Sequence, residues 1–212
     1  SNHVSAKDKN PMTTTPIQYP DTIPLFPLNV VLFPKGLLEL RIFEIRYLDM
    51  IKDCLKQQQE FGVVLIKAGL ENAGSPDIEK IGTLAKIVSF DQGPDGLLHI
   101  TVQGTEPFQV NSHSLESNGL TLGRIQPHLT QNEKILDSHS KPVSLLKKIL
   151  MNNREPDTLT PPILGEASWV AYRLAEFLEP TNQEKLAILA ESNAQLKLDK
   201  VEKIIKSRNS DY

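Results

Sequence analysis

The chain has 212 residues, of which 39% are hydrophobic and 23% charged, with a formal net charge of −3 at pH 7. This composition is typical of a folded globular protein and excludes a largely disordered chain. The near balance of charge excludes a global field that attracts nucleic acid or anionic lipid.

Residues 1–20 are polar and lack the continuous apolar region of a secretory signal, so we expect a flexible leader. Residues 23–50 read IPLFPLNVVLFPKGLLELRIFEIRYLDM, which is apolar but interrupted by Pro24, Pro27 and Pro34. Because proline lacks an N–H and fixes φ, these residues favour short or edge strands over a helix. The sequence predicts strands over 22–26 and 37–41, joined by a tight apolar corner typical of small β-barrels.

From residue 45 the apolar positions recur every three or four residues, which predicts an amphipathic helix that ends near residue 58. The β-branched run FGVVLIK predicts a strand over 61–67, followed by a polar loop over 68–80. Apolar alternation and the turn residues GPDG, at 93–96, predict the remaining strands over 83–90, 97–103, 108–114 and 120–125. Together these elements form a predicted β domain over residues 21–128.

The polar segment 129–141 is the predicted linker, and the chain beyond it is predicted to be helical over 142–208. The apolar spacing indicates helices over 142–152 and 166–178. Capping boxes at Thr181-x-x-Glu184 and Ser192-x-x-Gln195 predict two more, over 182–191 and 194–208. The predicted fold class is therefore α+β, a small β-barrel with one early helix followed by an α-helical bundle.

No residue pattern identifies a catalytic, cofactor or metal site. The segment Gly69–Pro76 has the glycine spacing of a phosphate-binding loop, but Ser75 stands where the loop needs lysine. The five histidines lack ligand spacing, no serine lies in a G-x-S-x-G elbow, and none of the many serines and lysines is singled out as a dyad. The single cysteine, Cys54, lies in an apolar helical pattern, excludes an internal disulfide, and agrees with a cytoplasmic location. We expect no enzyme, no cofactor and no membrane-spanning segment.

The blocks IPLFPLNVVLFPKGLLELRIFEIRYLDMI, FGVVLI, IGTLAKI and DGLLHITVQG occur in this order. They resemble the amino-terminal substrate-binding domain of Lon-type proteases, in the stand-alone bacterial form without ATPase or peptidase domains. The resemblance implies a PUA-like pseudobarrel followed by a small helical bundle. Pro107 precedes Phe108 where the family pattern has Arg, so any contact through that Arg is not expected here.

The resemblance implies a non-catalytic module that binds unfolded or exposed apolar segments of other proteins. Two alternatives stay open: RNA binding, as in other PUA-like barrels, and an adaptor for a folded partner such as Lon protease. Along 195–208, basic residues outnumber Asp199 and Glu202, but a solvated helix face explains them more simply than RNA does; they are Lys197, Lys200, Lys203, Lys206 and Arg208. The oligomeric state is not predicted.

Aromatic and arginine side chains commonly anchor polypeptide partners. The candidates for partner binding are Phe33, Arg41, Phe43, Arg46, Tyr47, Trp169 and Arg173. A structural role competes in each case: Phe33 and Phe43 would fill core corners, and Tyr47 would pack along its helix. Arg41 and Arg46 would pair with Glu39 and Glu44, while Trp169 would seal the two domains together.

Overall fold

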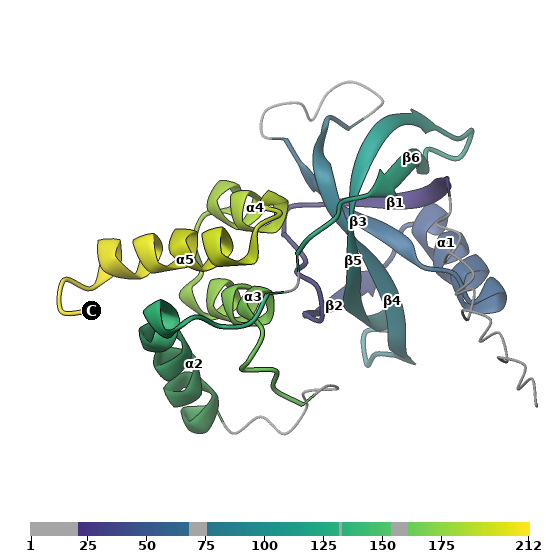
Figure 1. Ribbon diagram of the computed structural model, residues 1–212. Helices are drawn as coiled ribbons and strands as arrows, with labels where there is room; N and C mark the ends of the chain where they lie inside the picture. Colours follow the sequence, from purple (N-terminus) through teal and green to yellow (C-terminus); the bar gives the residue numbers. More distant parts are fainter. Residues whose placement is uncertain (1–20, 68–75, 132, 154–160) are drawn as a thin grey trace, which may run out of the picture.

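The computed structural model describes residues 21–67, 76–131, 133–153 and 161–212. The predicted leader and most of the predicted loop 68–80, including Ser75, lie outside the described residues. The strands are β1 (Thr22–Leu28), β2 (Leu37–Ile42), β3 (Phe61–Ile66), β4 (Ile78–Gln92), β5 (Leu98–Leu115) and β6 (Thr121–Pro127). The helices are α1 (Ile45–Gln57), the 3-10 turn η1 (Asp137–His139), α2 (Ser140–Asn152), α3 (Ala167–Leu178), α4 (Asn182–Ala190) and α5 (Ala194–Arg208). The predicted α+β class, with one early helix and a later bundle, is confirmed (Figure 1).

The six strands form one sheet in the order β2-β5-β4-β3-β1-β6, and β6 pairs back with β5. This extra pairing closes the sheet into a barrel, and β2 lies outside the closed ring as an added edge strand. Strands β1 and β3 pair in parallel, whereas the other pairs are antiparallel. The long strand β5 holds the barrel together because its first part pairs with β2 and its second part with β6.

Two expectations about strands were wrong. Residues 97–103 and 108–114 were predicted as separate strands but are parts of β5, because Ala85 pairs with Gly104 and Thr83 with Pro107. Thr105 and Glu106 thus lie opposite the single residue Leu84, and this one extra residue forms a bulge that bends the strand without ending it. The predicted loop also extends less far than residue 80, since Ile78 is buried, pairs with Ile66 and begins β4.

Strand β1 accommodates two prolines because each half has a neighbour on one side only. Strand β6 pairs with Thr22–Leu25, and β3 pairs with Leu25–Leu28. A proline lacks the N–H that a second neighbour would need, so it is tolerated where one flank is open. The C-terminal half of β1 is consequently unpaired on the side away from β3, within the part of the chain that the structure describes.

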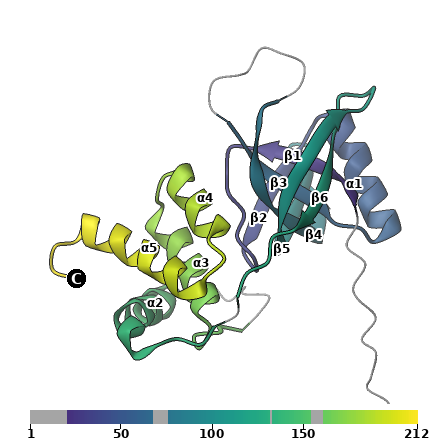
Figure 2. The ribbon, with the colours of Figure 1, turned by 45° about the horizontal axis from the view of Figure 1, so that its top comes forward.

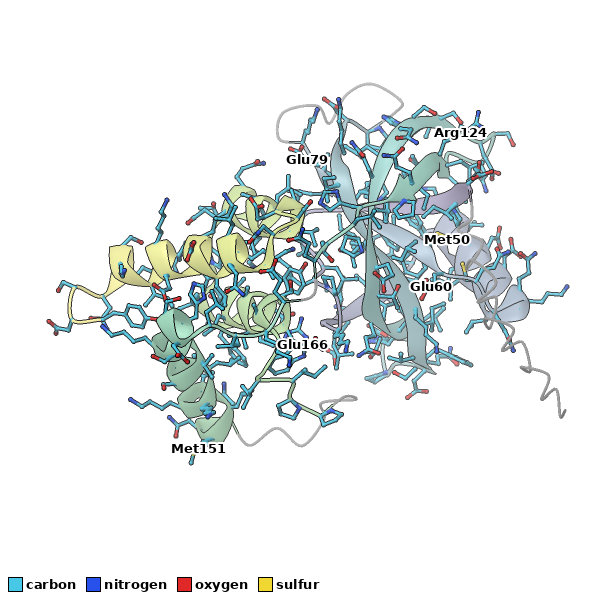
Figure 3. All side chains as sticks on the ribbon, viewed as in Figure 1. Met50, Glu60, Glu79, Arg124, Met151 and Glu166 are labelled. Carbon is cyan, nitrogen blue, oxygen red and sulfur yellow. The ribbon has the colours of Figure 1, made fainter. Side chains whose placement is uncertain are left out.

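Helix α1 lies against the barrel on the side away from the other helices (Figures 1 and 2). Met50, Ile51 and Cys54 form its buried face and pack with strand residues that include Phe61 and Val102. Figure 3 labels Met50 where α1 meets the barrel. The helix ends at Gln57, its C-cap Gln58 has a positive φ of 53°, and this boundary agrees with the predicted end near residue 58.

The C-terminal helices pack around α3, whose residues from Ala167 to Ala175 are all buried. A helix that is apolar on every side belongs in the centre of a bundle, and α3 contacts α2, α4 and α5. The capping box predicted at Thr181 and Glu184 is confirmed. The one predicted at Ser192 is wrong, because Asn193 is the N-cap of α5 and accepts from the Leu196 N–H at 3.0 Å.

The segment predicted as a linker is attached to the bundle by backbone hydrogen bonds. Gln131 donates to the Ser192 carbonyl at 2.9 Å, and Lys134 forms an isolated antiparallel bridge with Glu166. Figure 3 labels Glu166 at the start of α3. The division into domains at 128 and 142 stays a prediction. Within the described ranges, no helix is long and apolar enough to cross a membrane.

Candidate functional site

The seven candidate residues fall into two groups in the structure. Arg41, Phe43, Arg46 and Tyr47 line one surface groove. Phe33, Trp169 and Arg173 are buried where the barrel meets the helical bundle. Residue type alone grouped them together, and their positions in the fold separate them.

The groove lies between the C-terminal half of β1 and the end of β2, and its cavity volume is about 570 Å³. Five consecutive residues from Leu40 to Glu44 line one side, and three from Phe26 to Leu28 line the other. Tyr47 stacks on Phe26 with a centroid separation of 4.0 Å. Burial raises the pKa of Tyr47, so its hydroxyl is neutral and the aromatic pair presents an apolar surface to the groove.

Both arginines at the groove have carboxylate partners. Arg41 pairs with Asp95 at 2.6 Å rather than with Glu39, because the β4–β5 turn brings Asp95 beside β2. The Leu97 N–H, with His99 and Arg41, lowers the pKa of Asp95 to about 2, which keeps it charged. Arg46 pairs with Glu44 at 2.7 Å, as expected, and donates to the Gly119 carbonyl at 3.1 Å. The rim of the groove is therefore polar but balanced in charge.

Phe43 is 68% exposed, so the expectation that it fills a core corner was wrong. It lies in the short connection between β2 and α1, where neither element covers it. Ile45, which was not a candidate, is two positions further along the chain, at the start of α1, and is 75% exposed. The sequence signal for this surface was a large apolar residue, Phe43, in a connection, where polar residues are usual, with a second, Ile45, directly after the connection. Leu40 and Ile66 also line the groove and were missed, since their strands appeared to need them for the core.

The second group forms a buried junction between the two halves of the protein. Phe33 stacks on Tyr172 of α3 with centroids 5.3 Å apart. Arg173 donates to the Pro34 carbonyl and to Glu176, both at 2.8 Å, and its guanidinium lies 5.8 Å from the Trp169 ring. Burial lowers the pKa of Arg173 and raises that of Glu176, while their mutual attraction opposes both shifts. This geometry supports the structural roles of Phe33 and Trp169 and gives Arg173 one as well.

Lys197 was expected on a solvated helix face and is instead fully buried. Its Nζ donates to the Tyr172 hydroxyl and to the Ile188 carbonyl, at 3.2 Å in the second case. Burial lowers its pKa to about 7. The exposed basic face of α5 is thus smaller than the sequence indicated.

A second groove, of about 770 Å³, lies beside the C-terminal end of α1 and β4. Its lining includes Gln58, Lys86 and Cys54, and none of the seven candidates. Burial raises the pKa of Cys54 to about 11, so the thiol is a poor nucleophile. Among the described residues, no three His, Cys, Asp or Glu side chains gather as metal ligands.

The sequence of this chain is similar to the sequences of Lon proteases. A family model described as the ATP-dependent protease La (LON) substrate-binding domain matches residues 22–207. The Lon protease of Desulfosudis oleivorans is 25% identical over 195 residues, which cover 86% of this chain and 23% of that protein. The Lon protease of Parabacteroides distasonis is 36% identical over 93 residues, which cover 43% of this chain and 11% of that protein. The chain thus spans less than a quarter of the length of these two relatives.

Solved structures agree with the family match. The crystal structure of a Lon N-terminal domain protein from Xanthomonas campestris has a TM-score of 0.71 and 32% identity, covering 85% of this chain and 96% of that one. The N-terminal domain of a Mycobacterium avium complex Lon protease has a TM-score of 0.56 and 11% identity, covering 86% and 97%, which shows the shared fold alone. The matched family model describes the substrate-binding domain of the protease. The chain belongs to the family of Lon substrate-binding domains.

Proposed function

We propose that the protein binds unfolded or exposed apolar segments of other proteins through the groove between β1 and β2. The main observation behind this proposal is that the Phe43 side chain is exposed and lines a groove whose other lining residues are largely apolar. Large exposed aromatics beside a concave apolar surface are typical of binding sites for other molecules. The name of the matched family, a substrate-binding domain, agrees with this assignment.

The balanced charges favour a polypeptide over RNA. Each groove arginine has a carboxylate within 2.7 Å, so neither provides an unmatched positive charge for phosphate. The RNA alternative also loses support on α5, where the burial of Lys197 leaves a smaller basic face. RNA-binding surfaces need clustered cations and stacking aromatics together. The alternative function, an adaptor for one folded partner, is distinguished from binding of unfolded segments by the test described below.

We further propose that the chain binds polypeptides without cleaving them and acts in the cytoplasm. The match to the substrate-binding part of Lon supports binding without cleavage. The location is supported by the single, buried cysteine, which indicates a protein that does not depend on disulfides.

The test measures binding of fluorescein-labelled, reduced and carboxymethylated α-lactalbumin by fluorescence anisotropy. We expect the full chain to bind this permanently unfolded protein and to leave it intact on a gel, with or without ATP. Phe43→Ser is expected to weaken binding about tenfold, since losing an aromatic anchor costs about 1–2 kcal/mol. The matched control is Phe90→Ser, because Phe90 is 60% exposed on β4 and does not line the groove.

Equal effects of the two substitutions would contradict the assignment to this groove. Binding of folded proteins only, with none of the unfolded probe, would favour the adaptor.

A further inference from the structure

We propose that an extended polypeptide segment binds by adding a strand to the outer edge of β2, and that the groove prefers apolar side chains at alternate positions of this segment. The inference rests on the proposed function and specifies the geometry of binding. In this geometry, backbone hydrogen bonds to β2 hold the bound segment, and the groove determines which side chains of that segment fit.

Strand β2 is the edge of the sheet, since β5 is its partner on one side and no other described strand pairs with it. The groove lies beside the C-terminal half of this strand, where Leu40, Arg41 and Ile42 line it. Successive side chains of a strand point to opposite faces, so a cavity lined by three consecutive strand residues, Leu40 to Ile42, is bordered by the edge of the strand. The edge therefore faces the cavity.

The direction of the backbone groups follows from the start of the ladder. The Gly36 carbonyl accepts a hydrogen bond from the Gly104 N–H of β5 at 2.8 Å. Backbone groups of successive strand residues point to alternate sides, so in a regular ladder Leu38 and Leu40 turn toward β5. Leu37, Glu39 and Arg41 then turn their N–H and C=O groups toward the open side. An extended polypeptide carries donors and acceptors at this same spacing, and no other common ligand does.

The opposite wall of the groove leaves room for such a strand. The C-terminal half of β1 pairs with β3 on one flank and with no described strand on the other. Pro27 has no N–H to offer there, so β2 is the edge on which an added strand would pair. The added segment fills the gap in the sheet between β2 and β1.

Charge and side-chain burial indicate which segment fits. Along the edge and rim, Arg41 and Arg46 are already paired with Asp95 and Glu44, so neither offers a free cation to a charged segment, and the surface complements an uncharged one. Leu38, Leu40 and Ile42 are half-buried or buried, whereas Leu37, Glu39 and Arg41 are exposed. An added strand therefore meets apolar neighbours on one face and solvent on the other, and we expect apolar residues at every second position. Six residues of β2, at about 3.3 Å each, match a segment about 20 Å long.

The first experiment removes one outward N–H of β2. Glu39→Pro deletes that donor and places the proline ring on the open edge, a position that proline tolerates in native sheets. Glu39→Ala removes the same side chain but keeps the N–H. The probe is a fluorescein-labelled ten-residue peptide with valine at every second position and serine between. We expect Glu39→Pro to bind it at least tenfold more weakly than the unchanged chain, and Glu39→Ala to bind within about twofold. Circular dichroism checks that both variants stay folded.

The second experiment uses the unchanged chain, so it decides the matter even if Glu39→Pro fails to fold. Two versions of the peptide carry N-methyl groups on all valines or on all serines. Only one edge of an added strand faces β2, so one version should lose at least tenfold in affinity and the other less than about threefold. Equal effects of the two methylation patterns, or normal binding by folded Glu39→Pro, would overturn strand addition while leaving polypeptide binding in place. If neither the peptide nor unfolded α-lactalbumin binds the unchanged chain, both proposals are overturned.

Discussion

The ionisable amine of Lys197 is buried within the helical bundle. Its Nζ lies 4.3 Å from the centroid of the Tyr172 ring and reaches the carbonyls of Ile188 and Leu189 at 3.2 and 3.4 Å. Glu191 provides favourable charge, but the burial cost outweighs it, and the pKa of Lys197 falls to about 7. The carbonyls at the end of α4 thus have a donor that belongs to α5, so this side chain joins the two helices.

The pKa of Lys197 predicts how stability depends on pH. The folded value of about 7 lies below the ordinary value of 10.5, so the unfolded chain binds more protons between these pH values. The free energy of unfolding contributed by Lys197 therefore rises with pH from about 7 upward. Each pKa unit corresponds to about 1.4 kcal/mol, and we expect a gain of about 1.7 kcal/mol between pH 7 and pH 8.5.

The measurement is urea unfolding of the unchanged chain and of Lys197→Met at both pH values. Methionine keeps an unbranched apolar stem and removes the ionisable amine, so this pH-dependent gain should disappear in the variant. Parallel pH profiles for the two proteins would show that Lys197 does not titrate in this range.

At the scale of single elements, helix α5 begins at Ala194, as the sequence predicted, but its N-cap is Asn193 and not Ser192. Asn193 has an extended backbone, and its side chain accepts from the Leu196 N–H. Ser192 lies outside the helix, and its carbonyl accepts from Gln131. Asparagine and serine are both good N-caps. Asn193 is the cap because it directly precedes the first helical residue, Ala194.

Paired substitutions test which residue caps α5. Asn193→Ala is expected to lower the free energy of unfolding by about 1 kcal/mol, the usual cost of an N-cap. Ser192→Ala should change it by less than about 0.5 kcal/mol, because its backbone contact with Gln131 survives. Thermal or urea unfolding measures both, and a larger loss from Ser192→Ala would contradict the assignment.

At the scale of the whole molecule, the junction between barrel and bundle connects two cores. Arg173 of α3 reaches the Pro34 carbonyl in the corner between β1 and β2, and Phe33 in the same corner packs into the helical core. Gly104 allows this corner to approach β5, because a Cβ at that position would collide with the Phe33 carbonyl. The corner thus attaches the start of β2 to the helical bundle.

We expect Arg173→Met to destabilise the protein by about 3 kcal/mol, because it leaves the Pro34 carbonyl and Glu176 without their shared donor in a buried setting. Arg41→Met is the control, since its ion pair is exposed and worth less than about 1 kcal/mol. Urea unfolding followed by circular dichroism and tryptophan fluorescence measures both. The single Trp169 reports on the junction. Similar losses from the two substitutions would contradict a stabilising role of Arg173 at the junction.

The amino-acid sequence by itself determined the order and type of nearly all elements. Prolines exclude helix over 23–36, apolar spacing identifies α1 and α3, and Thr181 with Glu184 marks the start of α4. These signals are local, since they act within a few residues along the chain. They also sufficed for the resemblance to Lon substrate-binding domains, which depends on several blocks in order.

The tertiary structure alone decided which side chains meet. Whether β5 is one strand or two depended on a bulge opposite β4, and the partner of Arg41 depended on where the β4–β5 turn lies. Burial of Lys197 and exposure of Phe43 reverse what their chemical types suggest, because each depends on neighbours far away in sequence. The groove exists because β1 and β2, which are consecutive in the chain, each lack a described strand partner on the side that borders it. Strand pairing joins segments that are distant in sequence, so no local pattern predicts it.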